Sequence, residues 1–146
     1  MTNQSDIDQA YRTMIIIWLI LLFSQVVFLG VVFSLGGGGQ SATAAESVLG
    51  ANPEIVLGAA ILAVTNIAFA LFVRRRAIEQ AIADQNINHL RTGLVVGCAL
   101  CESVSIMGLV LAVVFSYPYF IAWFAAGIIG IFLQFPRRAS LIAAGG

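Results

Sequence analysis

Long apolar stretches separated by short polar segments dominate the pattern of residues along the chain. Four of these stretches carry almost no charge, and each is long enough to cross a hydrocarbon core of about 30 Å, which takes roughly 20 helical residues. None of them alternates apolar and polar residues with the period of two that is typical of a barrel strand. The pattern therefore predicts an all-α integral membrane protein with four transmembrane helices, at residues 14–35, 55–73, 93–117 and 118–135.

The composition agrees with this membrane architecture. Hydrophobic residues make up 60% of the 146 residues and charged residues only 10%, whereas a soluble domain has about 45–50% and about 25%. This composition excludes an ordinary water-soluble enzyme and a nucleic-acid-binding module. The formal net charge is zero, so no polyanionic partner is indicated. We expect a single four-helix membrane domain, residues 1–146, surrounded by lipid.

The arginines predict how the helices are oriented in the membrane. They lie before the first stretch, around the segment 74–92 and after the fourth stretch, and none lies in the segment 36–54. Positively charged residues near the ends of spans mark the cytoplasmic side. Both termini and a cytoplasmic linker at 74–92 are therefore predicted to be inside. The simplest location is a bacterial-type cytoplasmic (inner) membrane, with the protein crossing it several times.

The two halves of the chain share a short pattern. An Arg-Thr pair precedes the first and third stretches, and Pro53 and Pro118 stand near the start of the second and fourth. Arginines follow both the second and the fourth stretch. Such a pattern has two explanations: a duplication that produced two tandem helical hairpins, or the arginines that any hairpin with both ends in the cytoplasm collects.

Glu102 is the only acidic or basic residue inside a predicted span. It lies about 13 Å along the helix from Gly93, close to the middle of the membrane. A charge at that depth costs at least about 2.5 kcal/mol, so the side chain must be protonated, paired or facing a cavity. A carboxyl that is neutral in lipid and ionised on meeting water or a cation is what an H⁺ or Na⁺ carrier requires. The alternative is a protonated Glu that hydrogen-bonds to a neighbouring helix for packing alone.

Other polar side chains occur at a similar depth. Gln25 lies in the first stretch, and Thr65 and Asn66 lie in the second. We therefore predict a buried polar layer in the middle of the membrane. The candidate ion-binding residues are Glu102, Gln25, Asn66, Ser103 and Ser105.

Small residues on the third and fourth stretches predict close helix packing. On the third stretch they recur at the spacing of one helix face, and a shorter stripe occurs on the fourth. The candidate packing residues are Gly97, Cys101, Ser105 and Gly108 on the third stretch, and Ala126 and Gly130 on the fourth.

No residue pattern indicates catalysis, a cofactor or a metal. Cys98 and Cys101 spell C-x-x-C, but they lie in a membrane helix without a second ligand pair, where cysteine acts as a small apolar residue. The sequence contains no Ser–His–Asp set or paired carboxylates in a plausible cleft. We therefore expect a protein that is not an enzyme.

The segment around Glu102 resembles a known family. Leu90-Arg91-Thr92, followed by GCALCESVSIMGLV at 97–110, is similar to the carboxylate helix of the rotor-ring proteolipids, the c subunits of rotary ATP synthases. In that family the helix carries an essential Glu or Asp that binds H⁺ or Na⁺ as the ring turns. The resemblance implies that Glu102 is this carboxylate and that the protein forms an oligomer. The chain lacks the family's dense Gly-x-Gly-x-Gly run and its Arg-Gln-Pro-like turn, and Met107 stands where many members have Tyr.

Two functions follow from these observations. The first is a proteolipid-like membrane protein that binds or translocates H⁺ or Na⁺ through Glu102 as part of an oligomer. The second is a non-catalytic accessory, structural or assembly subunit of a larger membrane complex, in which Glu102 is a buried structural acid.

Overall fold

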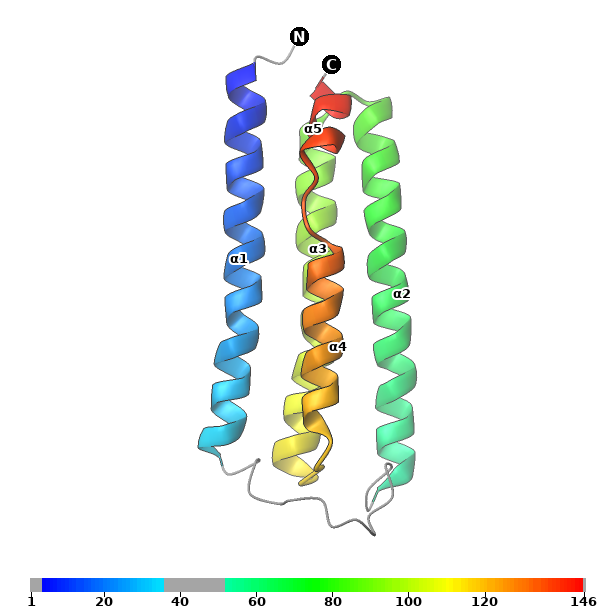
Figure 1. The fold of residues 1–146 in the computed structure, drawn as a ribbon. Coiled ribbons are helices and arrows are strands. Elements are labelled where there is room, and N and C mark those ends of the chain that lie inside the picture. Colours follow the sequence, from blue (N-terminus) through cyan, green and yellow to red (C-terminus); the bar gives the residue numbers. More distant parts are fainter. Residues whose placement is uncertain (1–3, 36–51, 146) are drawn as a thin grey trace.

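The computed structural model describes residues 4–35 and 52–145, and this part of the chain is built from α-helices (Figure 1). Three of the helices are long and apolar enough to cross a membrane, and α4 and α5 together provide a fourth candidate span that is bent by 43° at its break. The prediction of an all-α fold with several helices long and apolar enough to span a membrane is confirmed for the described residues. The helices are α1 (Gln4–Ser34), α2 (Pro53–Ala83), α3 (Ile87–Val114), α4 (Phe120–Leu133) and α5 (Arg138–Gly145).

Helix α3 lies in the middle of the bundle. Helices α1, α2 and α4 all pack against it, and α1 packs against α3 and α4 rather than against α2. Helices α1 and α3 run in one direction, and α2 and α4 run in the other (Figure 1). The start of α1, the connection from α2 to α3 and the short α5 therefore lie at the same end of the bundle, which we call the α5 end.

The helices differ in length from the predicted spans. The predicted linker 74–92 is mostly helical, because α2 continues to Ala83 and α3 begins at Ile87. At the opposite end, α3 stops at Val114 and α4 begins at Phe120, so the boundary predicted between residues 117 and 118 is a turn. Hydropathy marks where the chain is apolar, whereas the helix ends depend on local hydrogen bonds. Most of the predicted outer segment 36–54 lies outside the described residues.

Both α2 and α3 end in a turn with a left-handed residue. The residue after each C-cap has a left-handed backbone, with φ of 48° at Gln85 and 50° at Ser116. The next N–H then bonds back to a carbonyl near the helix end: Asn86 to Ala81 at 3.1 Å, and Tyr117 to Leu111 at 3.0 Å. The bond at the end of α2 is that of a Schellman motif, whereas the bond at the end of α3 reaches one residue further back. Glycine is the usual residue at such left-handed positions.

Two apolar clusters form the core, one toward each end of the bundle. Helix α1 contributes to them through a single stripe, as expected for a helix with one face on its neighbours. The buried residues of this stripe are Ile7, Met14, Trp18, Gln25 and Val32.

The C-terminal end of α4 is held by donors from two other helices. Trp18 of α1 donates its Nε1–H to the carbonyl of Ile131 at 2.8 Å. Arg74 of α2 donates to the carbonyl of Leu133 and, at 3.2 Å, to that of Phe135. The last carbonyls of a helix have no partner within the helix. The Ile131 carbonyl also accepts from the Gln134 N–H, so Trp18 adds a second donor there, and Arg74 supplies a donor to Leu133 and to Phe135 just after α4.

Replacing Ser116 by glycine should stabilise the fold. A non-glycine residue in the left-handed region costs about 1–2 kcal/mol, and the greater freedom of glycine in the unfolded chain offsets part of that gain. We expect Ser116→Gly to raise the free energy of unfolding by about 0.5–1 kcal/mol, measured by SDS titration of the detergent-solubilised protein. Ala99→Gly, in the interior of α3, is the control and should lower stability. A loss of stability in Ser116→Gly would contradict the prediction.

Candidate functional site

Polar side chains from α1 and α2 meet polar side chains of α3 near the middle of its length. Ser24 of α1 contacts Glu102 through a hydrogen bond between the Ser24 hydroxyl and Oε1 of the carboxyl group. On the other side, Asn66 of α2 donates from Nδ2 to the Ser103 hydroxyl at 2.8 Å. The helices therefore bring together a polar layer, arranged as two separate contacts.

The Ser24 hydroxyl lies between two acceptors. Its oxygen is 2.7 Å from the carbonyl of Leu21 and also contacts Glu102. A hydroxyl has one hydrogen to donate and lone pairs that accept. If Glu102 is ionised, Ser24 donates to the carboxylate. If Glu102 is protonated, the acid donates to Ser24, which then donates to Leu21. The same geometry therefore fits both protonation states of Glu102.

Two further polar side chains are buried near this level: Gln25 on the inner stripe of α1, and Ser105 on the face of α3 that packs against Gly127 of α4. Gln25 is 1% exposed and Ser105 is fully buried, and the polar atoms of both side chains lack a hydrogen-bond partner within the described residues. Because α1 and α3 run in the same direction and Ser24 contacts Glu102, Gln25 and Ser105 lie within about 3 Å of one level along the bundle. Buried polar groups are nearly always paired, so these atoms are available to a water molecule or an ion.

Not all of the predicted polar residues join this group. Asn66 and Ser103 bond to each other, and Ser103 donates onward to the carbonyl of Leu100 at 2.7 Å. Thr65 is exposed and donates to the carbonyl of Ile61 in its own helix. The structure thus places Gln25 and Ser105 near the level of Glu102, and it places Asn66 and Ser103 at the contact between α2 and α3.

Glu102 lies on the side of α3 that α4 does not cover. It is half-buried, and Ala99 and Ile106, about one turn before and after it, are exposed. The residues of α3 that face α4, by contrast, are buried. The carboxyl group is therefore within reach of lipid or of a second protein at the surface of the bundle.

The small residues of α3 allow α4 to approach it closely. A Cβ atom on Gly97 would come within 2.8 Å of Gln134, and one on Gly108 would come within 2.6 Å of Trp123. A Cβ on Gly130 would come within 2.7 Å of Cys101. Cys98 and Cys101 are both free and buried in this region.

Sequence reasoning missed two residues of this region. Gly127 makes the tightest approach, since a Cβ there would overlap the Ser105 hydroxyl, whereas the predicted Ala126 is half-buried in the core. The prediction paired Gly130 with the residue four positions earlier. A residue three positions earlier also lies on the same helix face, and that spacing would have indicated Gly127. Ser24 was also missed, although its place beside Gln25 in an otherwise apolar stretch was a usable signal.

No protein-family model, curated protein or solved structure matches the chain. What the protein does is therefore argued from its own residues.

Replacing Gly127 by alanine should separate α3 from α4. The added methyl group has no room beside Ser105, and overpacking of this kind costs about 1–3 kcal/mol. We expect Gly127→Ala to lower the free energy of unfolding by that amount in an SDS titration. Gly30→Ala is the matched control, because a Cβ at Gly30 meets nothing within 4 Å. Equal effects of the two substitutions would contradict the close packing described for Gly127.

Proposed function

We propose that the protein is a proteolipid-like membrane subunit in which Glu102 binds H⁺ or Na⁺ and passes it on, as part of an oligomer. The observation that carries this proposal is the position of Ser24 between Glu102 and Leu21. A carrier must hold its carboxyl group in both the protonated and the ionised form. A hydroxyl that can either accept from Glu102 or donate to it serves that requirement without a change of rotamer.

The surrounding oxygens also suit a cation. A hard cation such as Na⁺ prefers oxygen ligands, and the Glu102 carboxylate and the Ser24 hydroxyl offer two of them. The amide oxygen of Gln25 and the hydroxyl of Ser105 are buried and have no partner in the described part of the chain. They are the candidates to complete the coordination if Na⁺ is the ion, or to bind a water molecule if H⁺ is the ion.

An oligomer is consistent with the uncovered face of the bundle. Glu102 lies half-buried among exposed apolar residues between α1 and α2. A neighbouring subunit on this face would remove the carboxyl group from lipid and close the site. Membrane helices associate through packing and interhelical hydrogen bonds, and Glu102 offers such a bond.

A second function is favoured by one specific observation. The contact between Ser24 and Glu102 is complete within one chain, which is also what a buried structural acid needs. In that case the protein is a non-catalytic accessory or assembly subunit of a larger membrane complex.

Carbodiimide labelling tests the role of Glu102. The reagent attacks a protonated carboxyl group in apolar surroundings, so we expect selective modification of Glu102 in the purified protein at low to neutral pH. Labelling should fall as the pH rises, and Na⁺ should protect the carboxyl group if sodium is the ligand. Glu102→Gln should abolish the labelling, and Glu79→Gln, which removes an exposed acid, should leave it unchanged. Absence of labelling at every pH would refute the ion-carrier proposal.

The oligomeric state separates the two functions. Native mass spectrometry of the full chain in detergent should show one fixed stoichiometry with several copies if the protein is an ion-carrying oligomer. A strict monomer, or a single copy bound to other proteins, would favour the accessory role.

A further inference from the structure

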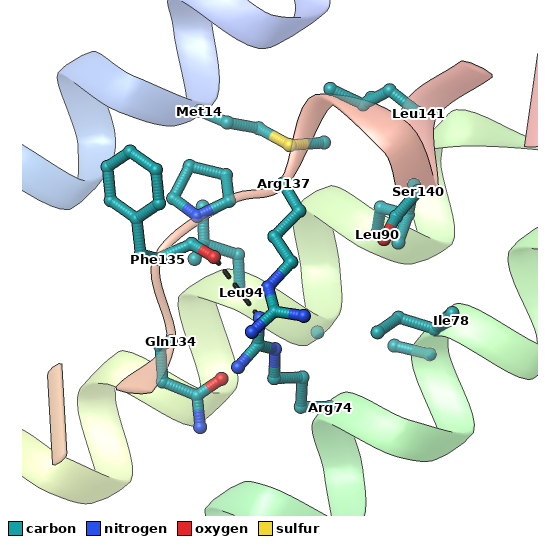
Figure 2. Close-up of a pocket in the computed structure, with 13 residues that line it drawn as sticks. Met14, Arg74, Ile78, Leu90, Leu94, Gln134, Phe135, Arg137, Ser140 and Leu141 are labelled. Carbon is teal, nitrogen blue, oxygen red and sulfur yellow. Dashed lines mark hydrogen bonds between the residues drawn. The ribbon is translucent and has the colours of Figure 1, made fainter. Parts of the chain in front are cut away.

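A small cavity lies at the α5 end of the bundle, among α2, α3 and the segment that joins α4 to α5 (Figure 2). Its volume is about 40 Å³, which is room for roughly three water molecules or for one compact polyatomic ion in contact with the walls. It is separate from the polar layer at Glu102. The polar side chains that line it are Arg74, Gln134, Arg137 and Ser140.

Two of these side chains carry the same charge. Figure 2 shows the guanidinium groups of Arg74 and Arg137 next to each other. The ion pairs formed among the described residues are Arg76 with Glu79, His89 with Asp84, and Arg138 with Asp8, so neither arginine of the cavity has an acidic partner there. Arg74 is half-buried and Arg137 is exposed. Two neighbouring like charges repel each other, and an anion between them would replace that repulsion by attraction.

Gln134 is an independent sign of a missing ligand. Its side chain is 1% exposed, and both its amide nitrogen and its amide oxygen lack a hydrogen-bond partner in the portion of the chain that the structure describes. The side chain lies against Gly97 of α3 and forms part of the cavity wall. A buried amide without a partner is costly, and an oxyanion in the cavity would accept a hydrogen bond from it.

The side chains around the cavity also offer enough hydrogen-bond donors to bind an oxyanion. A guanidinium group has five N–H donors, and Arg74 directs its bonds with Leu133 and Phe135 toward the end of α4. The remaining donors of Arg74, those of Arg137, the amide of Gln134 and the hydroxyl of Ser140 border one space. The planar guanidinium group of arginine can donate two parallel hydrogen bonds to the oxygens of a phosphate group, which the ammonium group of lysine cannot do.

We propose that this cavity binds one phosphate group, supplied either by the headgroup of an anionic phospholipid or by free phosphate. The proposal does not depend on the function proposed for Glu102. The surroundings favour the lipid, because Leu133 and Phe135 are exposed apolar residues beside the cavity where acyl chains can lie. Basic pockets between helices at the cytoplasmic side of a membrane are typical headgroup sites, and the distribution of arginines predicts that the α5 end is on that side.

Lipid retention by the full-length protein tests the site. The detergent-solubilised, delipidated protein is titrated with phosphatidylglycerol, and bound lipid is counted by native mass spectrometry. Arg137→Gln should weaken binding of the first lipid about tenfold or more, as expected for the loss of a charge-assisted hydrogen bond. Gln134→Leu should weaken it as well, although it leaves the charge unchanged. Arg75→Gln is the matched control, since Arg75 is an exposed arginine of α2 that does not line the cavity.

A second measurement separates the two sources of phosphate. Inorganic phosphate is added to the lipid-free protein, and the thermal unfolding temperature is recorded for the same variants. Stabilisation of the wild type that is lost in Arg137→Gln, without retention of phosphatidylglycerol, identifies free phosphate as the ligand. Retention of phosphatidylglycerol with the expected order of variants identifies the lipid. If neither ligand binds, or if Arg75→Gln reduces binding as much as Arg137→Gln does, the proposed site is wrong.

Discussion

The open end of α4 is the constraint on which the arrangement of the helices depends. The last carbonyls of a helix have no partner within the helix and need donors from elsewhere. Here the donors come from two different helices: Trp18 of α1 bonds to Ile131, and Arg74 of α2 bonds to Leu133 and Phe135. These bonds link α4 to α1 and α2, two helices that are not its neighbours in the chain. Helix α3 lies between them and makes the contacts that complete the bundle.

The central position of α3 explains why its two sides differ so much. The side toward α4 is lined by small residues and is closely packed, with Ser105 pressed against Gly127 and Cys101 against Gly130. The other side carries Glu102, which is half-buried against Ser24 of α1 and is not covered by α4. Close packing on one side holds the helix in place, while the carboxyl group on the other side remains accessible. A site that exchanges an ion needs both conditions, because a carboxyl group sealed in a core could not release what it binds.

The sequence predicted the spans well and the contacts between them poorly. Hydropathy identifies α1, α2 and α3 because long apolar stretches leave a helix few alternatives in lipid. It cannot place the helix ends, since the turns at Gln85 and Ser116 depend on backbone bonds that any residue can make. Glu102 was recognisable from its charge alone, whereas its contact with Ser24 and the cavity between Arg74 and Arg137 join residues far apart in the chain. With a single sequence, such pairs are found only from the fold.

The shortness of α4 also has a consequence for the bilayer around the protein. Its 14 residues rise about 21 Å, against about 30 Å for the hydrocarbon core, while α1 and α2 extend for 31 residues each. Ile121, Ile129 and Phe132 of α4 are exposed, so if α4 crosses the bilayer without α5, lipid meets a shorter apolar wall there than along α1 or α2. Hydrophobic mismatch of this kind thins the adjoining leaflets or attracts lipids with shorter chains. A span of this length would deform the surrounding bilayer asymmetrically and would favour neighbours that prefer a thin bilayer on the α4 side.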